Sequence, residues 1–142
     1  GCSKVITVDK IDSILPEADI LYLAMPETPG TKNLISRKRL DLLKTSCGIV
    51  NIGRQSTIDY DALCEKLRAN KIAGAILDVF TPEPIELNSK LWEIPNLIIT
   101  PHVSSDDGES YVRLTLELFT KNLKLFISNK PLINQVNKNL GY

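Results

Sequence analysis

Four short apolar runs follow one another along the chain up to residue 101, and each is followed by residues typical of turns. They are DILYLAM (19–25), GIVNI (48–52), AGAILDVF (73–80) and NLIITP (96–101). The runs are nearly continuous in apolar residues, which is typical of strands buried on both faces of a parallel sheet. We therefore expect a parallel sheet that is covered on both sides.

Helical patterns lie between these runs. SRKRLDLLK begins after Ser36 as an N-cap, and TIDYDALCEKLRANK has Asp59 as its N-cap and Asn70 near its end. Strands that alternate with helices through short connections predict right-handed βαβ units and an open α/β sheet. From residue 105 the pattern changes to one long amphipathic helix over 106–127, followed by an extended tail that begins at Pro131.

The beginning of the chain predicts a further short strand, GCSKVITV, and a helix of one to two turns, DKIDSIL. A complete dinucleotide-binding sheet would also have a glycine-rich turn after its first strand. The sequence contains no GxGxxG and no acidic residue at the end of a suitable second strand. We expect an incomplete Rossmann-like parallel sheet flanked by helices, which lacks the first βαβ unit with its glycine loop and is followed by the long C-terminal helix.

The composition excludes several classes of protein. The 17 basic and 17 acidic residues cancel, so neither nucleic acid nor an anionic membrane is an expected partner. No apolar run approaches the roughly 20 residues of a membrane helix, and the N-terminus lacks the apolar core of a signal peptide. Cys2, Cys47 and Cys64 form no CxxC pair, so we expect no metal site, no disulfide framework and a reducing, cytoplasmic setting.

Polar residues follow the apolar runs at the edge where open α/β sheets bind their ligands. Arg54 follows the second run and Asp78 the third, with Glu83 beyond it. The only histidine, His102, follows the fourth run. Each has an ordinary reading: Arg54 as a surface ion pair, Asp78 as a hydrogen-bonded buried acid, and His102 as a structural residue. Taken alone, Glu83 is an ordinary solvated loop acid, and Glu86 nearby competes with it for the same role. Together, however, Arg54, Asp78, Glu83 and His102 favour a functional site.

Three motifs in register resemble the D-isomer-specific 2-hydroxyacid dehydrogenases. They are NIGRQSTIDYDAL, GAILDVFTPEP and LWEIPNLIITPH, and the resemblance runs from about Ile14 to the C-terminus. Gln55 stands where the family usually has glycine, and Ile58 where it usually has valine. The closing NQVNKNLGY resembles the tail of the glyoxylate/hydroxypyruvate reductase branch.

The resemblance implies an NAD(P)-dependent oxidoreductase with Arg54, Glu83 and His102 as its catalytic residues. Arg54 would hold the carboxylate and ketone oxygens of a small 2-oxo acid in a planar fork. His102 would give a proton to the oxygen as hydride reaches the carbon, and would take the proton back in the reverse reaction. Glu83 would orient the ring and favour its charged form.

The resemblance also implies a set of residues that line the cofactor, NAD or NADP. The choice between the two cannot be made, because the residue that normally makes it ends a strand that is not in this sequence. The implied cofactor-binding residues are Pro26, Thr31, Ile52, Gly53, Arg54, Asp78, His102 and Ser104.

From the same resemblance we expect residues 1–104 to be part of an NAD(P)-binding domain, and 105–142 to be a crossover helix and tail of a substrate domain that is otherwise absent. The 142-residue chain alone should then be inactive, and the protein should form a homodimer through the nucleotide-binding domain. Two alternatives stay open: a non-enzymatic module of the same fold that senses dinucleotides, and an oligomerisation piece.

Overall fold

The computed structural model describes all residues from 1 to 142. The chain forms two compact units, Gly1–His102 and Val103–Tyr142. None of the helices combines the length and the apolar character that crossing a membrane requires.

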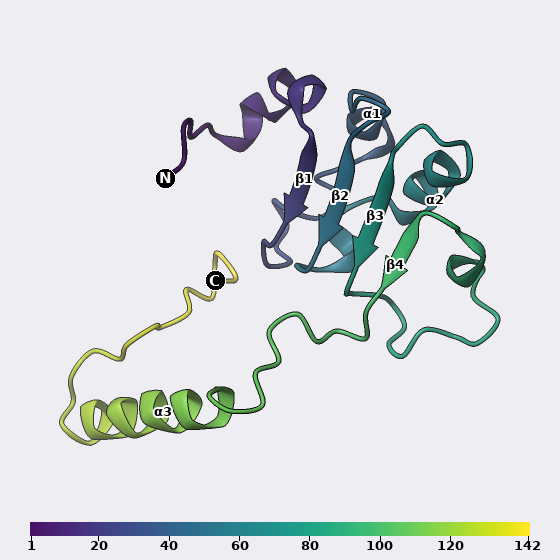
Figure 1. The fold of residues 1–142 in the computed structure, drawn as a ribbon. Coiled ribbons are helices and arrows are strands. Elements are labelled where there is room, and N and C mark those ends of the chain that lie inside the picture. The colour runs from purple at the N-terminus through teal and green to yellow at the C-terminus, as the bar shows by residue number, and fades with distance from the viewer. The chain divides into compact units, whose positions relative to one another are not determined.

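The first unit contains one sheet of four parallel strands in the order β1-β2-β3-β4 (Figure 1). The strands are β1 (Ile20–Leu23), β2 (Gly48–Asn51), β3 (Gly74–Leu77) and β4 (Leu97–Ile99). The predicted open parallel sheet is confirmed, with each strand inside its apolar run. Asn51 pairs with Leu23 on one side and Leu77 on the other, so the carboxyl ends of the strands are aligned along one edge.

Two α-helices connect the strands: α1 (Arg37–Leu40) between β1 and β2, and α2 (Tyr60–Arg68) between β2 and β3. The expected cap of α2 is confirmed, because the Asp59 carboxylate accepts a hydrogen bond of 2.9 Å from the backbone N–H of Ala62. Ser36 is the N-cap residue of α1, but its side chain makes no capping hydrogen bond. Short 3₁₀ segments complete the unit: η1 (Val8–Ser13), η2 (Leu15–Glu17), η3 (Gln55–Thr57) and η4 (Lys90–Glu93).

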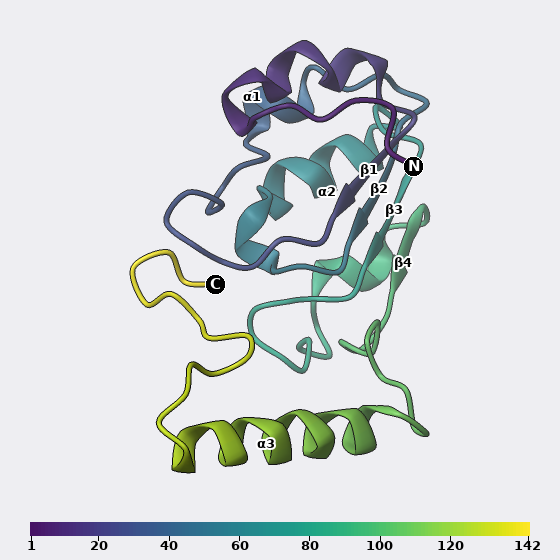
Figure 2. The same ribbon diagram turned by 90° about the vertical axis from the view of Figure 1, so that its left-hand side faces the viewer.

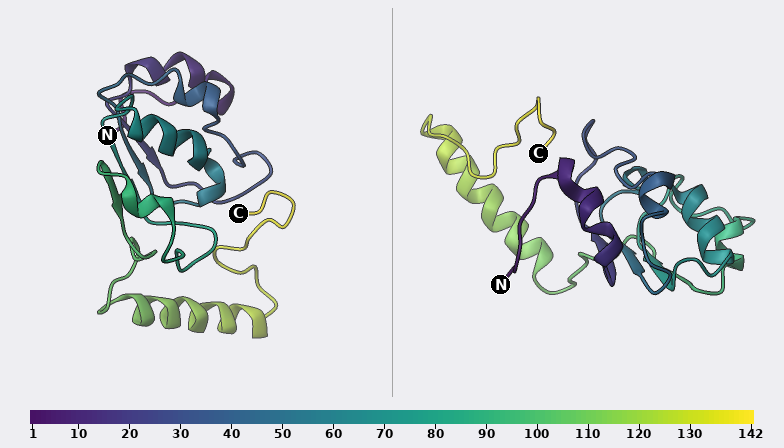
Figure 3. Two further views of the ribbon diagram at one scale, coloured as in Figure 1. Left: turned by 90° about the vertical axis from the view of Figure 1, so that its right-hand side faces the viewer. Right: turned by 90° about the horizontal axis from the view of Figure 1, so that it is seen from above.

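The expectation that both faces of the sheet are covered is wrong. One face carries the core, in which Leu23, Ile49 and Leu77 are buried. On the other face Ile20 is 67% and Ile98 59% exposed, and no helix of this unit covers it (Figures 2 and 3). Successive right-handed crossovers that proceed in one direction along a sheet place their helices on the same face, which explains this one-sided arrangement.

The expected N-terminal strand is also wrong: residues 1–7 form no strand, and the sheet begins at Ile20. The second unit contains the expected long helix, α3 (Tyr111–Ile127), which begins later than predicted. The Asp107 carboxylate accepts hydrogen bonds from the backbone N–H groups of Glu109 and Ser110, which forms a turn before the helix. The tail is tied to α3 by two hydrogen bonds between the Asn122 amide and the backbone of Ile133.

Candidate active site

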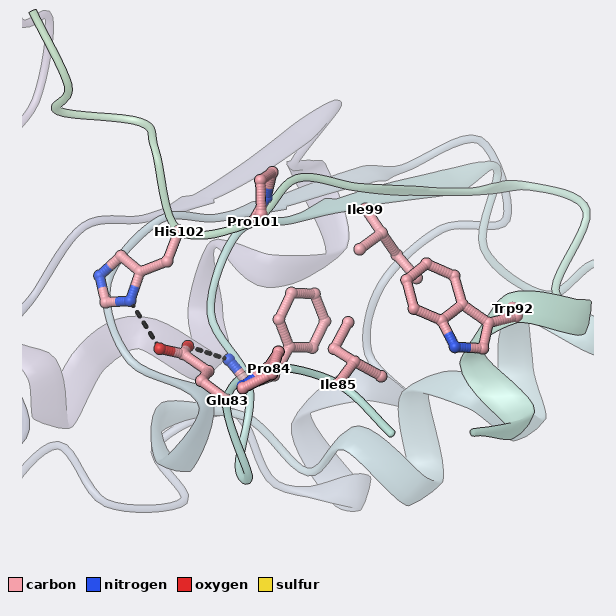
Figure 4. A pocket seen from close by; sticks show the side chains of 8 residues that line it. Glu83, Pro84, Ile85, Trp92, Ile99, Pro101 and His102 are labelled. Atoms are coloured by element: carbon pink, nitrogen blue, oxygen red, sulfur yellow. Dashed lines mark hydrogen bonds and ion pairs between the residues drawn. The ribbon is translucent and has the colours of Figure 1, made fainter. Parts of the chain in front are cut away.

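His102 and Glu83 form a hydrogen-bonded pair at the carboxyl edge of the sheet. His102 comes directly after Pro101, beyond the end of β4. Its backbone is in the left-handed conformation with φ of 57°, which residues other than glycine adopt uncommonly. Its Nδ1 atom lies 2.8 Å from Oε2 of Glu83, in the loop after β3 (Figure 4). The Nδ1 edge of the imidazole is therefore engaged, and Nε2 points away from the carboxylate.

The other oxygen of Glu83 is bound as well. The backbone N–H of Phe80 donates a hydrogen bond of 2.7 Å to Oε1. The hydrogen bond with His102 and the one from Phe80 hold the pKa of the Glu83 carboxyl below its usual value, and the positive charge of Arg54 adds to this effect. Glu86, the competitor in the sequence, is engaged differently: its carbonyl accepts a hydrogen bond of 2.9 Å from Nε1 of Trp92.

Arg54 reaches the same edge of the sheet from the end of β2. Its exposed guanidinium donates one hydrogen bond of 2.8 Å, from Nη1 to the carbonyl of Gly53. Because a guanidinium carries five N–H donors, it retains the capacity to bind a carboxylate with two parallel hydrogen bonds. Arg54, Glu83 and His102 thus come from the segments after three different strands, and the structure brings them to one edge.

The Arg54 segment is held by a buried residue that sequence reasoning missed. Asn51 is 0% exposed at the end of β2. Its Oδ1 accepts a hydrogen bond of 3.0 Å from the N–H of Gly53, and its Nδ2 donates one of 3.1 Å to the carbonyl of Arg54. The Thr57 hydroxyl donates to the same carbonyl at 2.7 Å. The available signal was an amide side chain at the end of the otherwise apolar run GIVNI.

Asp78 is also buried at this edge, with 1% of its surface exposed. Its Oδ1 accepts a hydrogen bond of 2.5 Å from the Thr100 hydroxyl, which lowers the cost of burying a carboxylate.

Gly53 lies where β1 and β2 end close together. A Cβ atom at position 53 would be 2.7 Å from the carbonyl oxygen of Met25, so only glycine fits without a backbone shift. Ile52 beside it is half-buried, and its N–H donates to the carbonyl of Leu23.

The remaining predicted cofactor residues are Pro26, Thr31 and Ser104. Pro26 and Thr31 are together in the loop after β1, where the Thr31 hydroxyl donates a hydrogen bond of 2.7 Å to the Pro26 carbonyl. This hydroxyl is therefore already used in shaping the loop. Ser104 belongs to the second unit, Val103–Tyr142.

A cavity of about 490 Å³ adjoins the Glu83–His102 pair. Nε2 of His102 points away from Ile85 and Trp92, which line the same cavity (Figure 4). The lining residues are Phe80, Glu83, Pro84, Ile85, Trp92, Ile99, Pro101 and His102.

The fold and the edge residues first define a class, the Rossmann-like domains that bind dinucleotides at the carboxyl ends of parallel strands. Residues 2–104 match the family model described as "D-isomer specific 2-hydroxyacid dehydrogenase, NAD binding domain". The chain therefore belongs to the D-isomer specific 2-hydroxyacid dehydrogenase family, and the match confirms the resemblance seen in its motifs.

Individual relatives agree with this membership. The chain is 41% identical over 100 residues to glyoxylate/hydroxypyruvate reductase B of Pectobacterium carotovorum, covering 70% of this chain and 31% of that protein. It is 34% identical over 134 residues to D-3-phosphoglycerate dehydrogenase of Haemophilus influenzae, covering 92% of this chain and 32% of that protein.

Among solved structures, the NADPH-dependent glyoxylate/hydroxypyruvate reductase of Sinorhizobium meliloti in complex with NADP and sulfate has a TM-score of 0.87 at 28% identity. The match covers 99% of this chain and 47% of that one. The chain thus spans between about a third and a half of the length of these relatives.

Proposed function

We propose that this chain is the part of an NAD(P)-dependent D-2-hydroxyacid dehydrogenase that carries its proton donor and its carboxylate-binding arginine. The reaction is the reduction of a small 2-oxo acid to the D-2-hydroxy acid, and the reverse oxidation. The observation that carries the proposal is the 2.8 Å hydrogen bond between Glu83 and His102, at the same edge of the sheet as Arg54. The chain alone, about a third to a half as long as its relatives, is expected to be inactive.

Arg54 selects and orients the substrate in this proposal. A 2-oxo acid presents a carboxylate beside a ketone, and a planar guanidinium can bind oxygens of both groups at once. This two-point contact fixes the plane of the substrate and therefore the face of the carbonyl that receives hydride. The Nη1 bond to the Gly53 carbonyl keeps the guanidinium near the backbone that ends β2.

His102 transfers the proton through Nε2. During reduction, negative charge develops on the ketone oxygen, and a protonated imidazole neutralises it by donating a proton. The Glu83 carboxylate accepts a hydrogen bond from the Nδ1–H of His102, which fixes the orientation of the ring and stabilises the imidazolium. In the oxidation the neutral Nε2 takes the hydroxyl proton. Because Glu83 is itself held by the Phe80 N–H, the ring orientation is set by the backbone.

The residues at this edge fit the nicotinamide end of NAD or NADP in their chemistry. Position 53 has no side chain, and Asp78, which follows the neighbouring strand β3, carries a carboxylate that is a hydrogen-bond acceptor of the kind a carboxamide requires. Ile52, Gly53 and Asp78 would hold this end of the cofactor, which when bound supplies the hydride. We assign Pro26, Thr31 and Ser104 to the rest of the cofactor, as the family resemblance implies.

Glyoxylate and hydroxypyruvate are the favoured substrates, because the tail NQVNKNLGY resembles that branch and one relative carries that name. The relative named D-3-phosphoglycerate dehydrogenase makes a phosphorylated hydroxy acid the main competitor. The test is an assay of the full-length protein at 340 nm. Glyoxylate, hydroxypyruvate and pyruvate are tested for reduction with NADH or NADPH, and D-3-phosphoglycerate is tested for oxidation with NAD⁺ or NADP⁺.

Turnover highest with glyoxylate or hydroxypyruvate supports the proposal. Turnover highest with D-3-phosphoglycerate overturns the substrate assignment, and dinucleotide binding without any turnover favours a sensing module. A homodimer formed through the nucleotide-binding domain, in a cytoplasmic setting, also belongs to this proposal. The cytoplasmic setting is consistent with the three cysteines, none of which forms a disulfide. Sedimentation of the full-length protein tests the dimer.

A further inference from the structure

We propose that Tyr60 is a positioning residue that keeps the Arg54 segment and the Glu83–His102 pair in register through its buried hydroxyl. The inference rests on the proposed function for its catalytic meaning. Tyr60 is the first residue of α2, and nothing in the sequence pattern distinguished it from a packing residue.

The hydroxyl of Tyr60 joins two segments that are far apart in the sequence. It donates a hydrogen bond of 2.7 Å to the carbonyl of Val79, and it accepts one of 3.4 Å from Nδ2 of Asn51. Tyr60 and Asn51 are both buried, so water does not substitute for either partner. The two bonds use the donor and one acceptor site of the hydroxyl and so fix its position.

Each end of this link leads directly to a proposed catalytic residue. On one side, the same Asn51 amide donates to the carbonyl of Arg54 at 3.1 Å. On the other side, Val79 is followed by Phe80, whose N–H donates to Glu83 at 2.7 Å. Glu83 then holds Nδ1 of His102 at 2.8 Å. A continuous chain of hydrogen bonds and adjacent peptide units therefore runs from Arg54 to His102 through the Tyr60 hydroxyl.

The ring and the hydroxyl of Tyr60 have separable roles. The ring packs edge-to-face on Phe80, with centroids 6.2 Å apart and planes at 80°. Tyr60→Phe keeps this contact and removes only the hydroxyl, which frees the Val79 carbonyl to move. Because Phe80 follows Val79, the N–H that fixes Glu83 moves as well. The matched control is Tyr22→Phe, since Tyr22 is exposed on the opposite face of the sheet.

The first measurement is made on the 142-residue chain and does not depend on activity. With His102 as the only histidine, ¹⁵N NMR of the imidazole reports one residue. Under conditions where the ring is neutral, we expect wild type and Tyr22→Phe to hold the proton on Nδ1. Tyr60→Phe should show a mixture of tautomers and an exchange rate of the Phe80 amide that is higher by about tenfold.

The second measurement is steady-state kinetics of the full-length protein with its best 2-oxo acid. Tyr60→Phe should lower kcat by about tenfold with little change in KM, while Tyr22→Phe should leave both unchanged. A Tyr60→Phe variant with a wild-type His102 spectrum and wild-type kcat would overturn the inference, even if its melting temperature falls. Absence of turnover in the wild type would instead overturn the proposed function, and the NMR comparison would still decide the role of Tyr60.

Discussion

Glu83 and His102 lie 19 residues apart in the sequence, and a hydrogen bond of 2.8 Å joins Oε2 of the first to Nδ1 of the second. The carboxylate is fixed from its other side by the Phe80 N–H, so the imidazole is oriented by a group that is itself anchored. The chain offers a matched pair of glutamates for testing this relationship.

Glu83→Gln should lower kcat of the full-length protein by about 10- to 100-fold, because the neutral amide no longer stabilises the imidazolium. Glu86→Gln is the control, since only the backbone carbonyl of Glu86 is engaged, with the Trp92 indole. Steady-state kinetics of both variants make the comparison. Equal effects of the two substitutions would contradict the assignment of Glu83.

The same hydrogen bonds make the contribution of Glu83 to the stability of the fold depend on pH. Its pKa lies below the ordinary value, first because of the hydrogen bond with His102 and then because of the one from Phe80. Its contribution to stability is therefore present above the pKa of an unfolded glutamate, about 4.3, and is lost as the pH falls through the lower pKa of the folded chain. The contribution is small, because the side chain is 36% exposed.

His102→Ala should raise the pKa of Glu83 toward its ordinary value, since it removes the largest cause of the depression. A ¹³C NMR titration of the Glu83 carboxyl in the 142-residue chain measures this change directly. An identical titration midpoint in wild type and variant would show that the hydrogen bond to His102 does not hold the carboxylate in solution.

Arg54→Lys should raise KM for the 2-oxo acid by about 10- to 100-fold, although the positive charge is kept. An ammonium is a point charge and cannot bind two oxygens in one plane as a guanidinium does. Arg37→Lys is the control, because Arg37 pairs with Glu65 on the surface at 2.6 Å. If lysine serves as well as arginine at position 54, Arg54 contributes charge alone and not geometry.

Gly53→Ala should destabilise the chain by about 1–3 kcal/mol, because the new Cβ would lie 2.7 Å from the carbonyl oxygen of Met25. Gly48 begins β2, the strand that Gly53 follows, and a Cβ atom there meets nothing within 4 Å, so Gly48→Ala should change stability little. Urea unfolding followed by circular dichroism compares them. A Gly53→Ala variant as stable as Gly48→Ala would mean that the two strand ends are not in close approach.

The parts of the fold that sequence predicted well are those governed by local pattern. Four apolar runs became four parallel strands, and the acidic residue before α2, Asp59, became its cap. The edge residues Arg54, Glu83 and His102 were predicted because parallel strands align their carboxyl ends, which a linear sequence already shows.

Features that depend on tertiary contacts were not predicted. GCSKVITV has the composition of a strand, but no neighbouring strand pairs with residues 1–7. The apolar runs indicated burial on both faces, whereas the crossovers placed both helices on one. The bonds of Asn51 and Tyr60 join residues on separate elements, and a polar side chain in a sequence does not reveal which distant carbonyl it will reach.

Kinetics of His102→Ala in the full-length protein, measured beside its affinity for the cofactor, test the proton-donor role most directly. Removal of the only group proposed to deliver a proton at Nε2 should lower kcat by about 10²- to 10⁴-fold. The Kd for NADH or NADPH, followed by nucleotide fluorescence, should stay nearly unchanged. Turnover that persists at the wild-type rate without the imidazole would contradict the assignment of His102 as the acid and base.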